Sequence, residues 1–219
     1  FLSVQPKVSV FFVNDGSKDK TLEVLWALKN QFPEQIEVLN MPQNSGKANA
    51  VRMGVCQVLL QKKILKVAYL DADLATSLEE CLRLSEYVKD EVLLAFGSRI
   101  LKLDNQIKRK WYRFLLGRLV ATAISNTLKL SIYDSQCGCK IFEFQIAEKI
   151  FDEVFISKWL FDVEIFFRMI RLFGRSEIQN QIREIPLRAW VDAPDSRVSP
   201  LFFFSLWWDL YLISKHYKR

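Results

Sequence analysis

The sequence contains a single histidine, His216, among its 219 residues. Its four cysteines are Cys56, Cys81, Cys137 and Cys139, and only the last two are close together, with a one-residue spacing that is not the usual pattern of a zinc knuckle. A zinc site built from histidine and cysteine is therefore not expected. We instead expect four reduced thiols, as in a cytosolic protein.

The chain also lacks a recognisable signal peptide and any uncharged apolar run long enough to span a bilayer. The nearest candidate, Leu201 to Ser214, is short and is interrupted by Asp209. We therefore expect that the chain is not an integral membrane protein. No repeat, low-complexity tract or linker marks a domain boundary, which favours one domain.

The composition is that of a folded globular protein, because 50% of the residues are hydrophobic and 26% are charged. The net charge of +6 suits nucleic acid, an anionic membrane surface or an anionic substrate. The lysines and arginines are scattered and no RNA- or DNA-binding motif is present, so nucleic acid is the least expected of the three.

The first half of the chain alternates between strand and helix patterns. Apolar runs predict strands, and apolar residues at helical spacing predict helices. The predicted strands are 7–13, 36–39, 64–70 and 92–96, and the predicted helices are 22–32, 46–61 and 77–89. Such alternation predicts an α/β fold with a mainly parallel central sheet and helices on both faces.

The second half is less regular. We predict helices at 108–130 and 161–173, a polar loop at 134–140 that leads into a short strand at 141–142, and an irregular strand at 177–190.

The N-terminal residues Phe1–Val4 also have the pattern of a strand, but only Gln5 and Pro6 separate them from the next one. Two parallel neighbouring strands need a crossover of about a dozen residues or more. Either Phe1–Val4 is not a parallel neighbour, or residues between the two segments are absent from this sequence, and we expect the second.

Polar motifs stand at the ends of three predicted strands: Asn14-Asp15, Asp71-Ala72-Asp73 and Gly97-Ser98-Arg99. In sheets of this kind, ligands bind beyond the carboxyl ends of the strands. We therefore expect the three motifs to form one site.

Asp71 and Asp73 follow an apolar strand directly. Carboxylates there can ligate Mg²⁺ or Mn²⁺, which prefer oxygen ligands and commonly share them with substrate phosphates. Such a metal would offset the charge on a departing nucleoside diphosphate. The alternative is two solvated aspartates, one of which caps the helix that starts near Ser77.

Two further motifs suit a nucleotide. Asp15 can accept hydrogen bonds from a base or ribose, and Gly16 permits a tight turn, although an ordinary Asn-Asp-Gly turn has the same residues. The segment Asn44-Ser45-Gly46-Lys47 precedes a helix, and a helix N-terminus with a nearby lysine binds anions. Simple capping by Asn44 or Ser45 is the alternative.

The basic residues Arg99, Arg109 and Arg113 suit an anionic acceptor, because arginine binds phosphate in a two-pronged geometry. Arg113 and Arg118 would otherwise face water. Asp162 and Glu164 open an apolar helix, where they either serve as N-terminal helix charges or orient a sugar.

Taken together, these segments resemble the family 2 glycosyltransferases of the GT-A fold, a Rossmann-like nucleotide-sugar-binding fold. Within that family they are most similar to the polyprenyl-phosphate sugar synthases, such as dolichyl-phosphate β-glucosyltransferase and dolichyl-phosphate mannose synthase. The resemblance rests on segments in the family's order, namely 13–21, 44–52, 71–76, 97–99, 134–140, 161–164, 184–190 and 196–198.

The resemblance implies an inverting enzyme that moves a hexose from a nucleotide sugar to a polyprenyl phosphate. It implies that the donor is bound by Asn14, Asp15, Lys47, Asp71 and Arg197, and that a Mg²⁺ or Mn²⁺ cofactor is held by Asp71 and Asp73. It places the acceptor phosphate at Arg99, with Arg109 or Arg113, and at Gln136. The implied catalytic residues are Asp73, Arg99 and Asp162.

The sequence departs from the family pattern in several places. The family's first strand and the Pro-x-Tyr-Asn-Glu loop after it are absent, Asn14 stands where Asp is common, and Cys139 stands where Phe is common. The segment Gln136-Cys137-Gly138 favours the glucosyl branch, hence UDP-glucose, with GDP-mannose as the other donor.

The last residues combine aromatic and basic side chains. Aromatics beside cations are typical of a helix that lies on a bilayer. We therefore divide the chain into a GT-A domain at 1–200 and a C-terminal helix at 201–219, which either rests on a membrane or packs on the core. The expected location is cytoplasmic, peripheral on the cytosolic face of a membrane.

Other functions remain open from the sequence. A family 2 enzyme acting on a sugar or glycolipid hydroxyl would need a true base such as Asp162. A non-catalytic nucleotide-sugar-binding protein is less expected, because Asp71, Asp73 and Arg99 are all present. A nucleotidyltransferase would not explain the Gln136-Cys137-Gly138 segment.

Overall fold

The computed structural model describes residues 1–61, 64–108, 111–191 and 200–218, without the side chains of 108, 111–113 and 200–204. The helices are α1 (Thr21–Gln31), α2 (Lys47–Leu59), α3 (Leu78–Ser85), α4 (Trp111–Leu128), α5 (Phe144–Phe151), α6 (Phe161–Gln181) and α7 (Pro200–Tyr217), with a short 3₁₀ helix η1 (Leu2–Val4). The strands are β1 (Val10–Asp15), β2 (Ile36–Met41), β3 (Lys66–Leu70), β4 (Leu94–Ser98), β5 (Gln106–Lys108), β6 (Cys139–Glu143), β7 (Ile182–Pro186) and β8 (Ala189–Val191).

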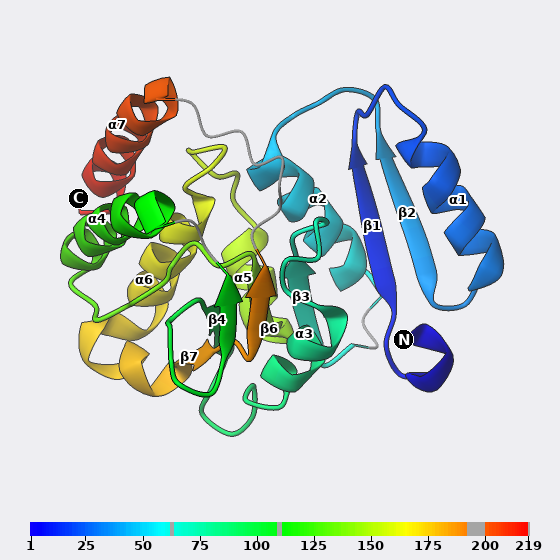
Figure 1. Ribbon diagram of the computed structural model, residues 1–219, viewed down its shortest axis with the longest axis horizontal. Coiled ribbons are helices and arrows are strands. Elements are labelled where there is room, and N and C mark those ends of the chain that lie inside the picture. The colour runs from blue at the N-terminus through cyan, green and yellow to red at the C-terminus, as the bar shows by residue number, and fades with distance from the viewer. Residues whose placement is uncertain (62–63, 109–110, 192–199, 219) are drawn as a thin grey trace.

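The strands form three sheets (Figure 1). The central sheet has the order β3-β6-β4-β7, with β6 antiparallel to both of its neighbours and β4 parallel to β7. The strands β1 and β2 pair in parallel as a separate sheet, and β5 pairs in parallel with β8. The predicted α/β fold with a parallel-rich sheet is confirmed, while the antiparallel β6 depends on pairing that no local pattern reveals.

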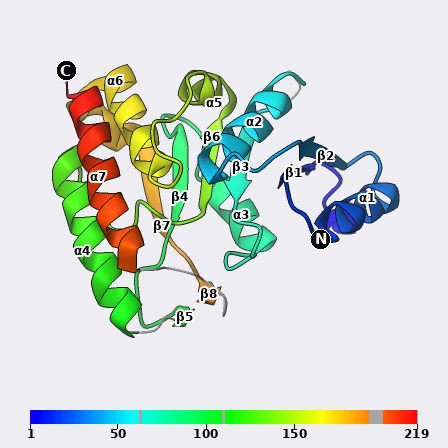
Figure 2. The same ribbon diagram turned by 90° about the horizontal axis from the view of Figure 1, so that it is seen from above.

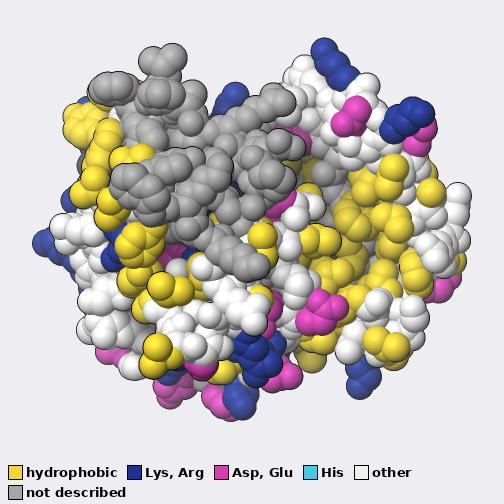
Figure 3. All heavy atoms as spheres, viewed as in Figure 1, with side chains coloured by type: hydrophobic (Ala, Val, Ile, Leu, Met, Phe, Trp, Pro, Cys, Tyr) yellow, Lys and Arg dark blue, Asp and Glu magenta, His cyan; other side chains and the backbone are white. Residues whose placement is uncertain are grey.

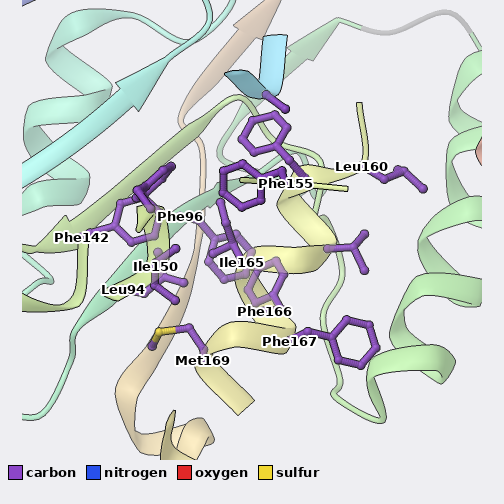
Figure 4. Packing of buried hydrophobic residues seen from close by; sticks show 14 of the residues in the cluster. Leu94, Phe96, Phe142, Ile150, Phe155, Leu160, Ile165, Phe166, Phe167 and Met169 are labelled. Atoms are coloured by element: carbon purple, nitrogen blue, oxygen red, sulfur yellow. The ribbon is translucent and has the colours of Figure 1, made fainter. Parts of the chain in front are cut away.

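Helices cover both faces of the central sheet (Figure 2). Side chains of a strand alternate between its faces, so Leu94 and Phe96 of β4 enter the core beside α5 and α6, whereas Ala95 enters a smaller core beneath α3. The larger core is rich in phenylalanine, and Phe96 meets Phe166 edge to face with their ring centroids 5.2 Å apart (Figure 4). Because helices pack on both of its faces, the central sheet is a rigid support for the site.

The N-terminal strand prediction is wrong, because Leu2–Val4 forms a 3₁₀ turn. The side-chain amide of Gln35 donates to the carbonyls of Leu2, Gln5 and Val8, which holds the segment against the start of β2. These hydrogen bonds from a distant side chain satisfy backbone carbonyls that a strand would leave for a neighbouring strand.

The predicted strand at 177–190 is also wrong in its first part. The chain kinks at Gly174, with φ of 76°, and then remains helical to Gln181 because the buried Ile178 anchors the extra turns in the core. Only then do β7 and β8 begin. The predicted helix at 77–89 is likewise too long, since α3 ends at Ser85.

The C-terminal helix α7 packs against α6. Its inner face buries Leu206, Leu210 and Ile213, and Ser157 donates from Oγ to Oδ2 of Asp209 at 2.5 Å. In the described part of the chain, no helix combines the length and the apolarity needed to cross a bilayer. The division into 1–200 and 201–219 stays a prediction.

Candidate functional site

The end of β1 is held to the start of α2 by Asp15. Its Oδ1 accepts hydrogen bonds from the backbone N and the Oγ of Ser45 at 2.7 and 2.9 Å, and its Oδ2 accepts from the N of Gly46 at 2.9 Å. The carboxylate therefore fixes the backbone just before α2, the helix whose N-terminus we predicted to bind a substrate anion. The role of Asp15 in nucleoside binding stays a prediction.

Asn14 and Gly16 shape the same turn. Asn14 is buried, donates from Nδ2 to Oδ1 of Asn40 at 2.8 Å and accepts from the N of Ser17 at 3.3 Å. Gly16 has φ of 68°, and a Cβ there would lie 2.5 Å from the N of Asn44. The turn thus needs glycine both for its backbone conformation and for its close approach to the segment before α2.

Lys47 joins this turn to the aspartate pair. Its Nζ lies 2.6 Å from Oδ1 of Asp71, so the first turn of α2 meets the turn that follows β3. Burial works to lower the pKa of Lys47, but the charges of Asp71 and Asp162 outweigh it and raise the pKa above its ordinary value. Lys47 is therefore a fixed cation at neutral pH.

Asp71 and Asp73 lie in a tight turn after β3. The N of Leu74 donates to the carbonyl of Asp71 at 3.2 Å, and the N of Ala75 donates to Oδ1 of Asp73 at 3.0 Å. Leu74 has φ of 51°, a left-handed conformation that is costly for a leucine. Strain of this kind tends to persist at functional sites, where the surrounding structure holds it.

The aspartate pair fits a hard divalent cation. Asp73 is exposed and Asp71 is partly exposed, and both present carboxylate oxygens, the ligands that Mg²⁺ and Mn²⁺ prefer. Among the described residues, no cluster of three or more His, Cys, Asp or Glu side chains could hold a metal alone. The remaining ligands would therefore be water or substrate oxygens, as is usual for Mg²⁺ at phosphates.

Arg99 is paired with Asp134, a residue that sequence reasoning did not single out. Its Nε and Nη2 both donate to the Asp134 carboxylate at 2.7 Å, and its backbone N donates to Oδ2 at 3.0 Å. Burial alone would raise the pKa of Asp134, but the Arg99 charge and hydrogen bonds lower it. One edge of the Arg99 guanidinium is therefore committed to the loop at 134–138.

Asp162 lies in a buried cluster, another feature that the sequence did not reveal. Its Oδ1 accepts from the hydroxyl of Tyr69 and from Nζ of Lys140, the latter at 2.6 Å. Lys140 is 0% exposed and also donates to the carbonyls of Ser135 and Cys137, both at 2.9 Å. A lysine inside the apolar run of β6 was the available signal for a buried ion pair.

Some predicted residues cannot be placed. Arg109 and Arg197 lie outside the described residues, as does the side chain of Arg113. Gln136 is described, and its Nε2 is buried without a hydrogen-bond partner among the described atoms. Arg118 does not simply face water, because its Nη1 donates to the carbonyl of Tyr133 at 2.7 Å.

Glu164 has a structural environment. It accepts hydrogen bonds from the N of Ile156 and the N of Ser157, and burial raises its pKa. It therefore fixes the loop between α5 and α6.

Residues 3–151 match the family model described as glycosyl transferase family 2. The chain belongs to this family. A curated relative, dolichyl-phosphate beta-glucosyltransferase of Drosophila melanogaster, is 30% identical over an alignment of 217 positions, which covers 95% of this chain and 63% of that protein. The Homo sapiens protein of the same name is 27% identical over 201 residues, covering 88% of this chain and 59% of the relative. This family 2 chain thus spans about three fifths of the length of these relatives.

Solved structures that are similar to this one confirm the predicted GT-A fold. Glucosyl-3-phosphoglycerate synthase from Mycobacterium tuberculosis, in complex with Mn²⁺, UDP-glucose and phosphoglyceric acid, aligns with a TM-score of 0.64 over 97% of this chain and 72% of that one. The same enzyme with Mg²⁺ and UDP aligns with a TM-score of 0.62. The identity of 14% in both cases shows the fold alone.

Proposed function

We propose that this family 2 protein is an inverting glucosyltransferase that moves glucose from UDP-glucose to dolichyl phosphate. The contact between Lys47 and Asp71 carries the proposal, because it joins the nucleotide-side turn of β1 and α2 to the metal-side turn of β3. The named relatives support the sugar and the acceptor, since they are dolichyl-phosphate beta-glucosyltransferases.

The donor is proposed to bind with its nucleoside near Asn14 and Asp15 and its diphosphate near Lys47. Asp71 and Asp73 would hold Mg²⁺ or Mn²⁺, which when bound neutralises charge on the diphosphate as it leaves. Lys47 adds a fixed positive charge at the same point. Arg197 is proposed as a further diphosphate ligand.

The acceptor phosphate is proposed to bind near Arg99 and Gln136, with Arg109 or Arg113. One phosphate oxygen attacks C1 of the glucose, the bond from C1 to the diphosphate oxygen breaks, and UDP leaves with that electron pair. A phosphate is already ionised at neutral pH, so no side chain has to remove a proton. Asp162 then acts by position, since its Oδ1 already holds Tyr69 and Lys140.

A lipid acceptor requires that the enzyme reach a membrane surface. On α7, Trp207, Trp208 and Tyr211 are exposed, and Trp208 keeps 61% of its surface in solvent. An apolar groove of about 570 Å³ lies on α4, lined by Leu115, Leu119 and Ala123 among others. These features support a peripheral position on a membrane, and we propose the cytosolic face as its side.

The test is a transfer assay with radiolabelled donor and dolichyl phosphate in detergent. We expect label from UDP-glucose to enter the organic phase, little label from GDP-mannose, and loss of transfer with EDTA and in Asp73→Ala. The exposed Glu148→Ala is the matched control and should retain transfer. Label that reaches only soluble sugars would support a hydroxyl acceptor and contradict the proposal.

A further inference from the structure

Gly138 lies directly against the carboxylate of Asp71. A Cβ built on Gly138 would lie 1.9 Å from Oδ2, 2.1 Å from Cγ and 2.7 Å from Oδ1 of Asp71. Real Cβ atoms do not approach other heavy atoms this closely, so any side chain at 138 would force one of the two residues to move. The Asp71 carboxylate therefore takes the volume that a side chain at position 138 would fill.

Position 138 requires glycine because there is no space for a larger side chain. The glycines with positive φ among the described residues are Gly16, Gly46 and Gly174, and Gly138 is not one of them. A left-handed backbone is therefore not what requires glycine at position 138. What alanine cannot do is share the volume with Asp71.

The loop that carries Gly138 cannot easily move aside. Gly138 accepts a hydrogen bond from the N of Asp71 at 2.9 Å, which ties the two backbones together. The buried Nζ of Lys140 holds the carbonyls of Ser135 and Cys137, and Arg99 holds Asp134. The loop is thus fixed at both ends and in its middle, so the Asp71 side chain has to give way.

If the Asp71 carboxylate moves, it loses a specific contact. Its Oδ1 lies 2.6 Å from Nζ of Lys47, and the same carboxylate is the proposed metal ligand. A rotation away from position 138 changes both contacts at once. Substitution of a residue that orients a metal ligand commonly lowers the metal affinity about 10- to 100-fold.

We propose that Gly138 is a positioning residue that sets the orientation of the Asp71 carboxylate toward Lys47 and the donor-bound cation. The catalytic consequence rests on the proposed function, whereas the steric coupling between the two residues does not.

The test is a double-mutant cycle of Gly138→Ala and Asp71→Ala with two measurements. The first is the thermal midpoint of the protein without ligands. Asp71→Ala removes the three atoms nearest to the added Cβ. We therefore expect Gly138→Ala to lower the midpoint by several degrees in the natural background and to have little effect beside Asp71→Ala.

The second measurement is the Mn²⁺ concentration that gives half-maximal binding of UDP-glucose, followed by calorimetry. Gly138→Ala should raise it about 10-fold or more. Gly54→Ala is the control, because its Cβ would meet Cγ2 of Val13 at 2.6 Å and no atom of Asp71. It should lower the thermal midpoint equally in both backgrounds and leave the Mn²⁺ requirement unchanged.

Two results would overturn the proposal: an equal thermal loss from Gly138→Ala with and without Asp71, or an unchanged Mn²⁺ requirement in Gly138→Ala. If the natural protein fails to glucosylate dolichyl phosphate, the proposed function falls, yet the thermal cycle, which uses no ligand, still decides whether Gly138 and Asp71 are sterically coupled.

Discussion

Two regions of the molecule contain equally apolar strands but bury them very differently. All five residues of β4 in the central sheet are buried, whereas in β1 only Asn14 is buried, although Val10–Val13 form a continuous apolar run. Figure 3 shows apolar side chains gathered on the surface over the N-terminal region of β1, α1 and β2. A strand that is apolar on both faces is normally covered on both.

The difference has a consequence for the site. In the central region Arg99 follows the fully buried β4, Asp71 follows β3 and Asp134 lies in the loop before β6, while the N-terminal region presents Asn14 and Asp15 from a thinly covered sheet. Regions with few buried apolar contacts open at lower free energy than the core does. We therefore expect the metal and acceptor side to be rigid and the nucleoside side to be the easily opened half.

The largest difference in the free energy of unfolding is expected between variants of two lysine ion pairs that have similar N–O distances. Lys140 and Asp162 are 2.6 Å apart with exposures of 0% and 4%, and Lys29 and Glu37 in the N-terminal region are 2.5 Å apart with exposures of 27% and 50%. Lys140→Met leaves Asp162 buried without its cation and should lower the free energy of unfolding by about 3–5 kcal/mol. Lys29→Met should lower it by about 1 kcal/mol or less.

Denaturant titration of both variants checks this contrast. Similar losses of unfolding free energy in the two variants would contradict the distinction between a buried and an exposed region.

A smaller difference in stability is expected between asparagine substitutions at two aspartates, Asp134 and Asp15. Because Arg99 lowers the pKa of Asp134 below its ordinary value of 3.8, the stability from this pair is present above about pH 4 and is lost as the pH falls through the folded-state pKa. Asp134→Asn should therefore destabilise the protein at pH 7 by a few kcal/mol and make acid unfolding less steep.

The matched change in the N-terminal region is Asp15→Asn. The asparagine keeps one side-chain oxygen that can accept a hydrogen bond from the backbone before α2. The free energy of unfolding at pH 7 should therefore fall by only about 1 kcal/mol. Thermal midpoints between pH 3 and pH 7 separate the two variants. An unchanged acid slope in Asp134→Asn would show that the Arg99 pair does not set it.

The smallest effect is expected at Leu74, in the turn after Asp73. Its left-handed φ of 51° disfavours leucine, and the side chain is 53% exposed, so little burial is lost on substitution. Leu74→Asn should stabilise the protein by about 1 kcal/mol, since asparagine tolerates this conformation. A lower thermal midpoint in Leu74→Asn would show that Leu74 contributes packing that outweighs the strain.

Local patterns predicted much of the fold. The apolar runs before Asp15, Asp71 and Ser98 are strands, as predicted. The pattern failed at Phe1–Val4, where Gln35 from a distant segment satisfies the backbone, and beyond Gly174, where burial of Ile178 continues the helix.

The missed parts of the site share a physical cause. The pairs of Arg99 with Asp134 and of Lys140 with Asp162 join residues 35 and 22 positions apart in the chain. They form only because β6 inserts between β3 and β4, and such pairing is decided by tertiary packing rather than by any local sequence pattern. The fit of Gly138 against Asp71 has the same origin.

Hydrogen exchange with and without UDP and Mn²⁺ tests most directly whether a nucleotide binds between the two regions. We expect the amides of β1 and of the turn at Asp15 to exchange faster than those of β4 in the free protein. Nucleotide should slow exchange at 10–17 and at 44–48 far more than in β4. Exchange that is already equal in the two regions, or protection by UDP that leaves 10–17 unchanged, would contradict a donor site at this junction.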